Sequence, residues 1–292
     1  MRVSGLGHFP LGTPVPPKEH AVCVSIPTFK DLVGYEEKKP EILNKLKSGY
    51  PRFVRHQRIN VLSKYWNRQK PEAPNETFFF SNPKDWDFAQ NILKISEAEV
   101  EQQEKYLIVH IPGRSKDCAK LHKFFQHAGV GLSSRHAETI LDSLGILSIG
   151  ESVTPNLAAE DDIKSIISKA HGPQVSPEDV LLTISGANAF TSVFRAALIQ
   201  AKQQQKKLWV RLGWLYLDTI EIMDLLVENQ AQIIDLNHPD EFYKLEEIFN
   251  SCGQDIAGIV TEFPSNPLLH SCDLVKVRQL CDQHNALLIV DP

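Results

Sequence analysis

The stretch "IAGIVTEFPSNPLLHSCDLVKVRQLCDQHNALLIVDP" (256–292) decides the fold. Its first eight residues (256–263) form an apolar run of strand length, and residues 286–291 form a second one. Between them, residues 272–285 carry apolar side chains at the spacing of an amphipathic helix. A strand, a helix and a strand in this order predict two parallel strands joined by a helical crossover.

The same alternation continues toward the amino terminus. Strand-like runs occupy residues 179–185, 207–213 and 231–236, and helix-length amphipathic segments occupy residues 187–205, 218–229 and 240–252. Strands that alternate with helices favour a parallel sheet over hairpins. We therefore predict an α/β fold whose mostly parallel sheet, with helices on both faces, extends from about residue 158 to residue 292.

The rest of the chain divides into two further regions. Residues 1–50 are rich in proline, which fixes φ and removes amide donors, so they predict an extended arm. Residues 51–157 mix the apolar runs 77–80 and 106–112 with a helical stretch at 119–129, and they predict a divergent, mixed α/β segment of βαβ-like character.

Composition narrows the class of protein. The chain has 292 residues, is 42% hydrophobic and carries a net charge of −5 without a block of lysine and arginine, which argues against nucleic-acid binding. The sequence has neither a signal-peptide pattern nor an apolar run near the roughly 18 residues of a membrane span, so we expect a cytoplasmic protein. Its five cysteines are irregularly spaced with no C-x-x-C pair, which predicts reduced thiols and no metal site.

Polar residues follow the predicted strands. Ser185, Gly186 and Ala187 open a helix, where a tight turn and free amide N–H groups suit a phosphate, although Ser-Gly is also common in ordinary turns. Tyr216 follows the next strand and either stacks on a planar ring or packs against the protein. Asp218 is the expected N-cap of the helix that follows.

Two more candidates lie in the stretch that decides the fold. Asn266 stands between two prolines directly after a buried strand, which suits either a fixed hydrogen bond to a ligand or a plain turn. Asp291 ends the last strand and either pairs with a ring N–H or is simply solvated. Because parallel strands end at one edge of a sheet, we expect Gly186, Tyr216, Asn266 and Asp291 to line one crevice.

Taken together, these motifs resemble the Cys/Met-metabolism family of pyridoxal-phosphate (PLP) enzymes. "EFPSNPLL" (262–269) is similar to that family's Glu-(Ser/Thr)-Pro-(Ser/Thr)-Asn-Pro-Leu stretch, and "ALLIVDP" (286–292) follows at the right interval. Residues 185–186 resemble its phosphate turn, residues 216–219 its Tyr-Gly-Gly-Thr, and residues 50–52 its Tyr-x-Arg. The resemblance covers roughly residues 41–66 and 176–292, and the chain departs from it where both glycines after Tyr216 and the methionine at Ala187 are replaced.

The resemblance implies a function and a set of roles. The fold would be the large domain of a fold-type-I PLP-dependent transferase, with the PLP phosphate on Ser185, Gly186 and Ala187. Tyr216, the one candidate catalytic residue, would stack on the cofactor ring, Asn266 would hold the ring's phenolic oxygen and Asp291 its nitrogen. Tyr50 and Arg52 would reach the phosphate in a neighbouring subunit of a dimer or tetramer.

The implied reaction is that of a cystathionine gamma-synthase: an O-activated homoserine and cysteine give cystathionine. A cystathionine lyase and an O-acylhomoserine sulfhydrylase of the same family are alternatives, as is a nucleotide-binding or non-catalytic α/β protein. In this family the Schiff-base lysine lies one strand beyond the aspartate that corresponds to Asp291, so we expect an amino-terminal portion that is inactive alone.

Overall fold

The computed structural model describes residues 9–46, 55–70, 75–149 and 156–292. By their contacts these residues form two compact units. Unit 1 contains residues 1–126 and 130–182, and unit 2 contains residues 127–129 and 183–292.

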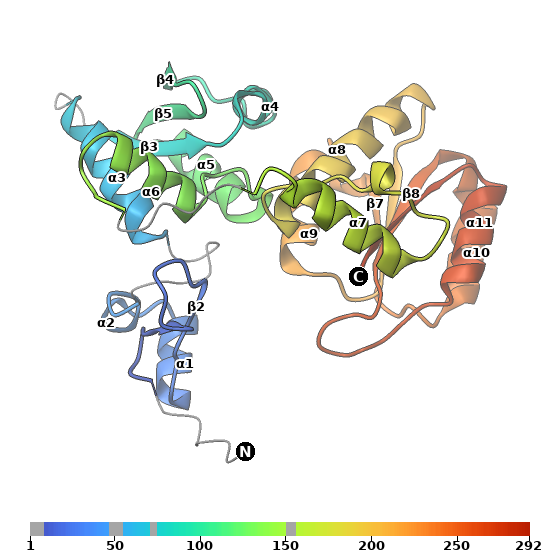
Figure 1. Ribbon diagram of the computed structural model, residues 1–292. Coiled ribbons are helices and arrows are strands. Elements are labelled where there is room, and N and C mark those ends of the chain that lie inside the picture. Colours follow the sequence, from blue (N-terminus) through green and yellow to red (C-terminus); the bar gives the residue numbers. More distant parts are fainter. Residues whose placement is uncertain (1–8, 47–54, 71–74, 150–155) are drawn as a thin grey trace, which may run out of the picture. The chain divides into compact units, whose positions relative to one another are not determined.

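Unit 2 is built on a parallel sheet of four strands (Figure 1). The strands are β6 (Leu208–Leu212), β7 (Ile233–Leu236), β8 (Ile256–Glu262) and β9 (Leu287–Asp291). Their order is β7-β6-β8-β9, and each neighbouring pair is parallel. The predicted α/β class and the parallel sheet are confirmed, and all four strands fall on predicted apolar runs.

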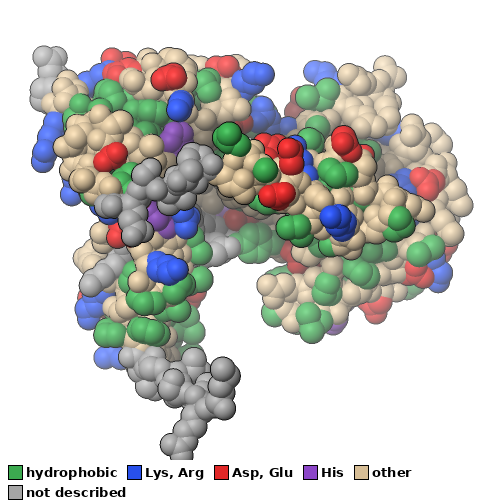
Figure 2. All heavy atoms as spheres, in the orientation of Figure 1, with side chains coloured by type: hydrophobic (Ala, Val, Ile, Leu, Met, Phe, Trp, Pro, Cys, Tyr) green, Lys and Arg blue, Asp and Glu red, His purple; other side chains and the backbone are tan. Residues whose placement is uncertain are grey.

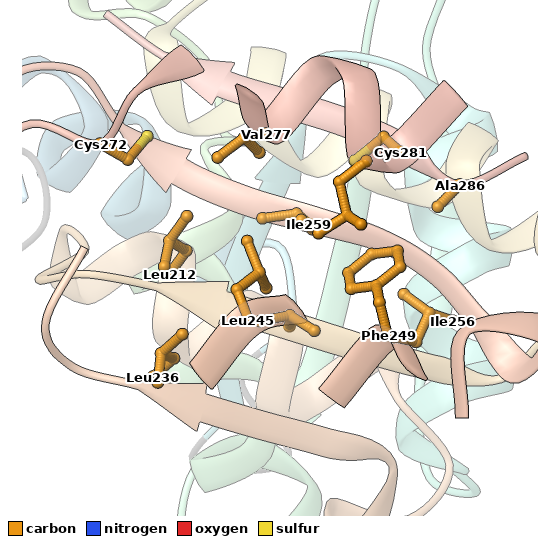
Figure 3. Close-up of a cluster of buried hydrophobic side chains, with 12 residues drawn as sticks. Leu212, Leu236, Leu245, Phe249, Ile256, Ile259, Cys272, Val277, Cys281 and Ala286 are labelled. Carbon is orange, nitrogen blue, oxygen red and sulfur yellow. The ribbon is translucent and has the colours of Figure 1, made fainter. Parts of the chain in front are cut away.

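Helices cover both faces of this sheet, as predicted. They are α8 (Gly186–Gln203), α9 (Leu217–Leu226), α10 (Phe242–Cys252) and α11 (Leu274–Gln283). Val210 and Leu212 of β6 pack in one core with Phe249 of α10 and Val277 of α11. Figure 3 shows Leu212, Phe249 and Val277 in this core. The neighbouring Trp209 points to the opposite face, because side chains alternate along a strand, and its ring contacts Phe194 of α8 at 4.8 Å between centroids.

One predicted strand of this region is wrong. Residues 179–185 contain no strand; the short 3-10 helix η1 (Pro177–Asp179) ends there, and irregular backbone leads into α8. Leu181 is 86% exposed and Ile184 56% exposed. An apolar run forms a strand only where a neighbouring strand supplies backbone partners, and no described strand pairs with this one.

Unit 1 holds a three-stranded antiparallel sheet with the order β3-β5-β4. The strands are β3 (Asn75–Phe80), β4 (Glu99–Gln102) and β5 (Leu107–Pro112). The two apolar runs predicted here become β3 and β5 and pair antiparallel, so they do not form a βαβ unit with each other. The βαβ-like expectation holds only for β3-α4-β4, whose two strands run parallel on either side of β5. Apolar runs alone do not reveal strand direction, which is set here by the turn of residues 103–106 that joins β4 to β5.

Four helices of unit 1 pack against this sheet: α3 (Gln57–Arg68), α4 (Pro83–Leu93), α5 (Lys116–Ala128) and α6 (Ser134–Ser143). A further helix, α7 (Ala159–His171), contacts the 3-10 helix η1. Phe79 faces a core shared with Leu62 of α3 and Leu141 of α6, whereas Phe78 points the other way and its ring contacts Phe125 of α5. The run 77–80 is buried throughout because both faces of β3 are covered.

The first turn of α7 carries Glu160, Asp161 and Asp162. Acidic side chains of this region are visible along α7 in Figure 2. Negative charge at a helix amino terminus is favourable because it faces the positive end of the helix dipole.

The amino-terminal arm is less extended than predicted. Two short strands, β1 (Pro14–Val15) and β2 (Cys23–Val24), form an antiparallel pair, and two helices follow, α1 (Phe29–Glu36) and α2 (Pro40–Leu43). Helix α1 begins where Thr28 accepts a hydrogen bond from the Asp31 amide, a local N-cap that proline counting misses. Among the described residues, no helix has the length and apolar character needed to span a bilayer.

Candidate functional site at the carboxyl ends of the strands

A single carboxylate organises the edge of the sheet in unit 2. Glu262 is the last residue of β8 and is only 9% exposed. The Tyr216 amide donates a hydrogen bond to its Oε1, and the Asn266 amide donates one to its Oε2 at 3.1 Å. Glu262 thereby fixes the loop after β6 and the loop after β8 at one point.

Asp291 lies directly beside this carboxylate. It pairs with Glu262 in the register of β8 and β9, and its carbonyl oxygen accepts the Phe263 amide at 3.0 Å. Burial raises the pKa of Glu262, the two amide donors oppose that rise, and the Asp291 charge adds to it. Burial also raises the pKa of Asp291. Two carboxylates with raised pKa values therefore stand side by side at the strand ends.

The loop that carries Asn266 is closed by its own hydrogen bonds. Ser265 is 2% exposed. Its amide donates to the His270 carbonyl at 2.9 Å, and its hydroxyl accepts the His270 amide at 3.0 Å. The Leu269 amide returns to the Ser265 carbonyl at 2.8 Å. This buried serine anchors the loop, while the neighbouring Asn266 is exposed and presents its amide group to the surroundings.

The start of α8 is the expected phosphate seat. Ser185 is its N-cap, and its hydroxyl accepts the Asn188 amide at 3.1 Å. The first amides of a helix have no partner within it, and the helix dipole makes this end positive. A Cβ atom built on Gly186 would meet no atom within 4 Å, so there is space next to the first residue of the helix.

A short segment from the end of α5 joins the starts of α8 and α9. His127 Nδ1 lies 2.7 Å from Asp218 Oδ1, and both residues are buried. Gly129 has φ +63°, and a Cβ at this position would lie 2.4 Å from Ser185 Oγ and 2.8 Å from the Asn188 amide nitrogen. The close packing of His127 on α9 and of Gly129 on α8 brings Ser185 and Asp218 into one neighbourhood.

Asp218 corrects one prediction, because it is not an N-cap. The N-cap of α9 is Tyr216, and Asp218 lies in the first turn with its carboxylate toward His127. Nothing local in the sequence points to His127, which is 91 residues away along the chain. Glu262 stood within the quoted motif, but its role as the common acceptor of two loops required the structure.

The predicted residues thus fall into three groups. Tyr216, Asn266 and Asp291 meet around Glu262. Ser185, Gly186 and Ala187 form the start of α8. Tyr50 and Arg52 lie outside the described residues.

The fold and these strand-end residues define a class: an α/β protein with helices on both faces of a parallel sheet, consistent with the large domain of fold-type-I PLP-dependent transferases. No family model matches the chain. Individual proteins do match it over nearly its whole length.

An L-2-amino-4-chloropent-4-enoate dechlorinase/desaturase of Streptantibioticus cattleyicolor is 26% identical over 280 residues, which cover 95% of this chain and 55% of that protein. A cystathionine gamma-synthase-like enzyme of Amanita muscaria is 24% identical, with coverage of 97% and 60%. The cystathionine gamma-synthase of Neurospora crassa is 23% identical, with coverage of 97% and 65%.

The chain is therefore similar over most of its length to enzymes named cystathionine gamma-synthase or cystathionine gamma-synthase-like, and the family resemblance predicted from the motifs is confirmed. It spans 55% to 65% of the length of these relatives. Because the matches cover 95% or more of the chain, they include most of the segment between residues 67 and 175, which the motif comparison had left aside.

Proposed function

We propose that this chain binds PLP at the carboxyl ends of β6, β8 and β9 and is part of a trans-sulfuration enzyme of the cystathionine gamma-synthase type. The observation that carries the proposal is the arrangement around Glu262, which holds Tyr216 and Asn266 next to Asp291. When bound, PLP supplies an electron sink for the pair released as a proton leaves the substrate Cα.

Asp291 fits the role of partner to a protonated ring nitrogen. Its side chain is half-buried, and among the described residues no side-chain or backbone donor makes a hydrogen bond to its carboxylate. Burial raises the pKa of Asp291, which means that the ionised carboxylate lacks favourable partners. A cationic N–H placed against it would supply one.

The other side chains suit the remaining parts of the cofactor. Tyr216 is 37% exposed and offers an aromatic face. The side chain of Asn266 is exposed, and its carboxamide NH2 can donate a hydrogen bond to the phenolic oxygen of the cofactor. The amides of Gly186 and Ala187, at the start of an 18-residue helix and next to open space, suit the phosphate.

The proposal includes a second subunit. The planar guanidinium of an arginine binds a phosphate through two parallel hydrogen bonds, and a tyrosine hydroxyl adds a third donor. Tyr50 and Arg52 would supply these groups to the phosphate of a neighbouring chain in a homodimer or a tetramer built from such dimers.

The proposed substrates are small amino acids. An O-activated homoserine would lose its γ-substituent and then accept the thiol of cysteine, a step of methionine and cysteine metabolism. Elimination without the second substrate, the reaction of a lyase, is the second candidate, because one relative is named as a dechlorinase/desaturase. All five cysteines are free thiols, which supports a cytoplasmic location as part of this proposal.

Cofactor titration tests the assignment of Asp291. We would express the longest form that the gene encodes and measure PLP binding by absorbance for the parent, Asp291→Asn and Asp291→Ala. Loss of a charged hydrogen bond of about 1.5 to 3 kcal/mol weakens binding by roughly 10- to 150-fold. Asp255→Asn, an exposed aspartate just before β8, is the matched control and should bind like the parent. Equal affinity in all four proteins would contradict the assignment.

Subunit mixing tests the shared site. Chains carrying Arg52→Ala and chains carrying Asp291→Ala are each expected to be nearly inactive as homodimers. In a mixed dimer, one of the two sites receives a parent Arg52 from one chain and a parent Asp291 from the other, so about half of the parent activity per dimer should return. Mixed dimers as inactive as the two homodimers would show that Arg52 acts within its own chain.

A further inference from the structure

Three side chains of metal-ligating type meet in unit 1, whereas the strand-end site belongs to unit 2. Glu76 lies on β3, and Cys118 and His122 lie on α5. His122 Nε2 is 2.7 Å from Glu76 Oε2, and Cys118 Sγ is 3.5 Å from the same oxygen. The ligand atoms of all three residues lie within 4.8 Å of one another.

We propose that Glu76, Cys118 and His122 form a binding site for a divalent transition metal of the zinc type, with a fourth position open to water. A thiolate, an imidazole and a carboxylate are the ligands that zinc takes in proteins. Two of them are held by one helix, because residues four apart lie on the same face. The third comes from a strand of the sheet against which that helix packs.

The distances are close to those of a metal site. Bond lengths of about 2.0 to 2.3 Å in a tetrahedron place ligand atoms roughly 3.3 to 3.8 Å apart. The Cys118–Glu76 distance of 3.5 Å already falls in that range. His122 Nε2 must move away from Glu76 Oε2 by about an ångström while staying within reach of Cys118 Sγ, and its side chain is 48% exposed and therefore able to rotate.

The surroundings orient the carboxylate and set the charge. Arg55 NH2 lies 3.4 Å from Glu76 Oε1, the oxygen that faces away from Cys118 and His122. Glu76 Oε2 is thereby directed at the other two ligands. With Cys118 ionised, the two negative ligands neutralise a divalent cation, and the Arg55 charge remains outside the first coordination shell.

Metal binding at this site must displace a proton. Burial and the adjacent Glu76 carboxylate raise the pKa of the Cys118 thiol to about 11. The cation takes the place of that proton, so each metal bound forms one sulfur–metal bond, breaks one S–H bond and releases one proton to solvent. Affinity is therefore expected to increase with pH.

Cysteine spacing alone does not reveal such a site. The prediction of no metal rested on the absence of C-x-x-C, whereas here only one ligand is a cysteine and the carboxylate lies 42 residues before it. The Cys-x-x-x-His spacing within a helix is the one local signal, and it is common in helices without a metal.

Cobalt titration tests the proposal on the full-length chain after removal of metals by a chelator. Cobalt(II) is expected to bind one ion per chain and to produce a thiolate-to-metal charge-transfer absorbance, and zinc should displace it. Cys118→Ala should abolish this absorbance, whereas Cys281→Ala should retain it; Cys281 is also buried, and burial raises its pKa to about 11 as well. His122→Ala, at a half-exposed position that folding tolerates, should weaken binding at least tenfold.

Two results would contradict the metal site. No charge-transfer absorbance between neutral and alkaline pH would overturn the proposal and leave a hydrogen-bonded cluster. Equal cobalt binding by the parent, Cys118→Ala and His122→Ala would place the metal elsewhere on the chain. Because neither measurement involves PLP, failure here leaves the proposed function untouched.

Discussion

Replacing Glu262 by alanine should loosen both loops of the strand-end site at once. Its carboxylate is the acceptor for the amides of Tyr216 and Asn266, which belong to the loops after β6 and β8. Removing it takes away the acceptor that both amides share. The strands themselves keep their ladders, so the damage should be local.

The expected magnitude follows from these two bonds. A buried donor that loses its partner costs about 1 to 3 kcal/mol. Two such donors give roughly 2 to 6 kcal/mol, and relief from the nearby Asp291 charge and from burial of Glu262 itself returns part of this. We therefore expect a net loss of about 2 to 4 kcal/mol. Glu262→Gln keeps one acceptor oxygen and should lose about half as much.

Hydrogen exchange measured by mass spectrometry is the suitable assay, because unit 1 and unit 2 need not unfold together. Peptides covering residues 213–218 and 263–270 should exchange faster in Glu262→Ala. A local loss of about 2 kcal/mol corresponds to roughly 30-fold faster exchange. A peptide from α10 serves as the internal reference, since it lies on the sheet away from these loops.

Two results would refute this reasoning. If exchange of both loop peptides is unchanged, Glu262 is not the element that holds them. If only the loop around Asn266 changes, the Tyr216 amide relies on another acceptor. Glu262→Gln separates the two effects, because a variant that keeps one acceptor oxygen should retain one protected loop.

Three further predictions concern the same unit. His127→Ala should destabilise unit 2 by about 1 to 3 kcal/mol, because it removes the 2.7 Å contact with Asp218. A double-mutant cycle with Asp218→Asn, measured by urea unfolding, should show a coupling free energy of about 1 kcal/mol or more. If the two losses are additive, the contact contributes little to stability. Gly129→Ala should destabilise more than Gly145→Ala, since both have positive φ but only Gly129 would place its Cβ against Ser185, and equal thermal midpoints would contradict that packing. Because burial raises the pKa of Asp291, the folded chain holds that proton more tightly than the unfolded chain does. The contribution of Asp291 to stability is therefore fully present below the ordinary carboxyl pKa of about 4 and is lost as pH rises through the raised value, and the difference in urea midpoint between the parent and Asp291→Asn should change over that interval.

The sequence predicted the sheet of unit 2 because its strands are apolar runs that alternate with helices, and the central strand β8 is buried along its whole length. Such strands appear as unbroken apolar runs, as in residues 256–263, and the helices between them have the length and periodicity of crossovers. The run 179–185 has the same appearance but forms no strand, since a pattern does not show whether a partner strand is present. The antiparallel pairing of β3 and β5 in unit 1 was missed for a similar reason. The pattern of apolar residues indicates which side chains are buried, but it does not indicate which strand lies next to which or in what direction.

The sequence indicated the individual residues of the candidate site, but it did not indicate the hydrogen bonds that hold them in place. Tyr216, Asn266 and Asp291 were found because each ends a strand or follows one, and a parallel sheet gathers such positions. The contacts that fix them come from further away. Glu262 accepts the amide of Tyr216, which lies 46 residues before it, and His127 contacts Asp218 across 91 residues. Contacts of that separation leave no periodicity in a single sequence.

The two neighbouring carboxylates at the strand ends, Glu262 and Asp291, have different roles. Both carboxylate oxygens of Glu262 accept hydrogen bonds from backbone amides, whereas no donor among the described residues makes a hydrogen bond to the carboxylate of Asp291. Burial, together with a smaller effect of the Asp291 charge, raises the pKa of Glu262, and burial raises that of Asp291, so the folded chain favours a positive charge at this point. Under the proposed function, a protonated ring nitrogen is that charge. Its binding would relieve the repulsion felt by Glu262 and so strengthen the hold on both loops, which means that cofactor binding and loop order should increase together.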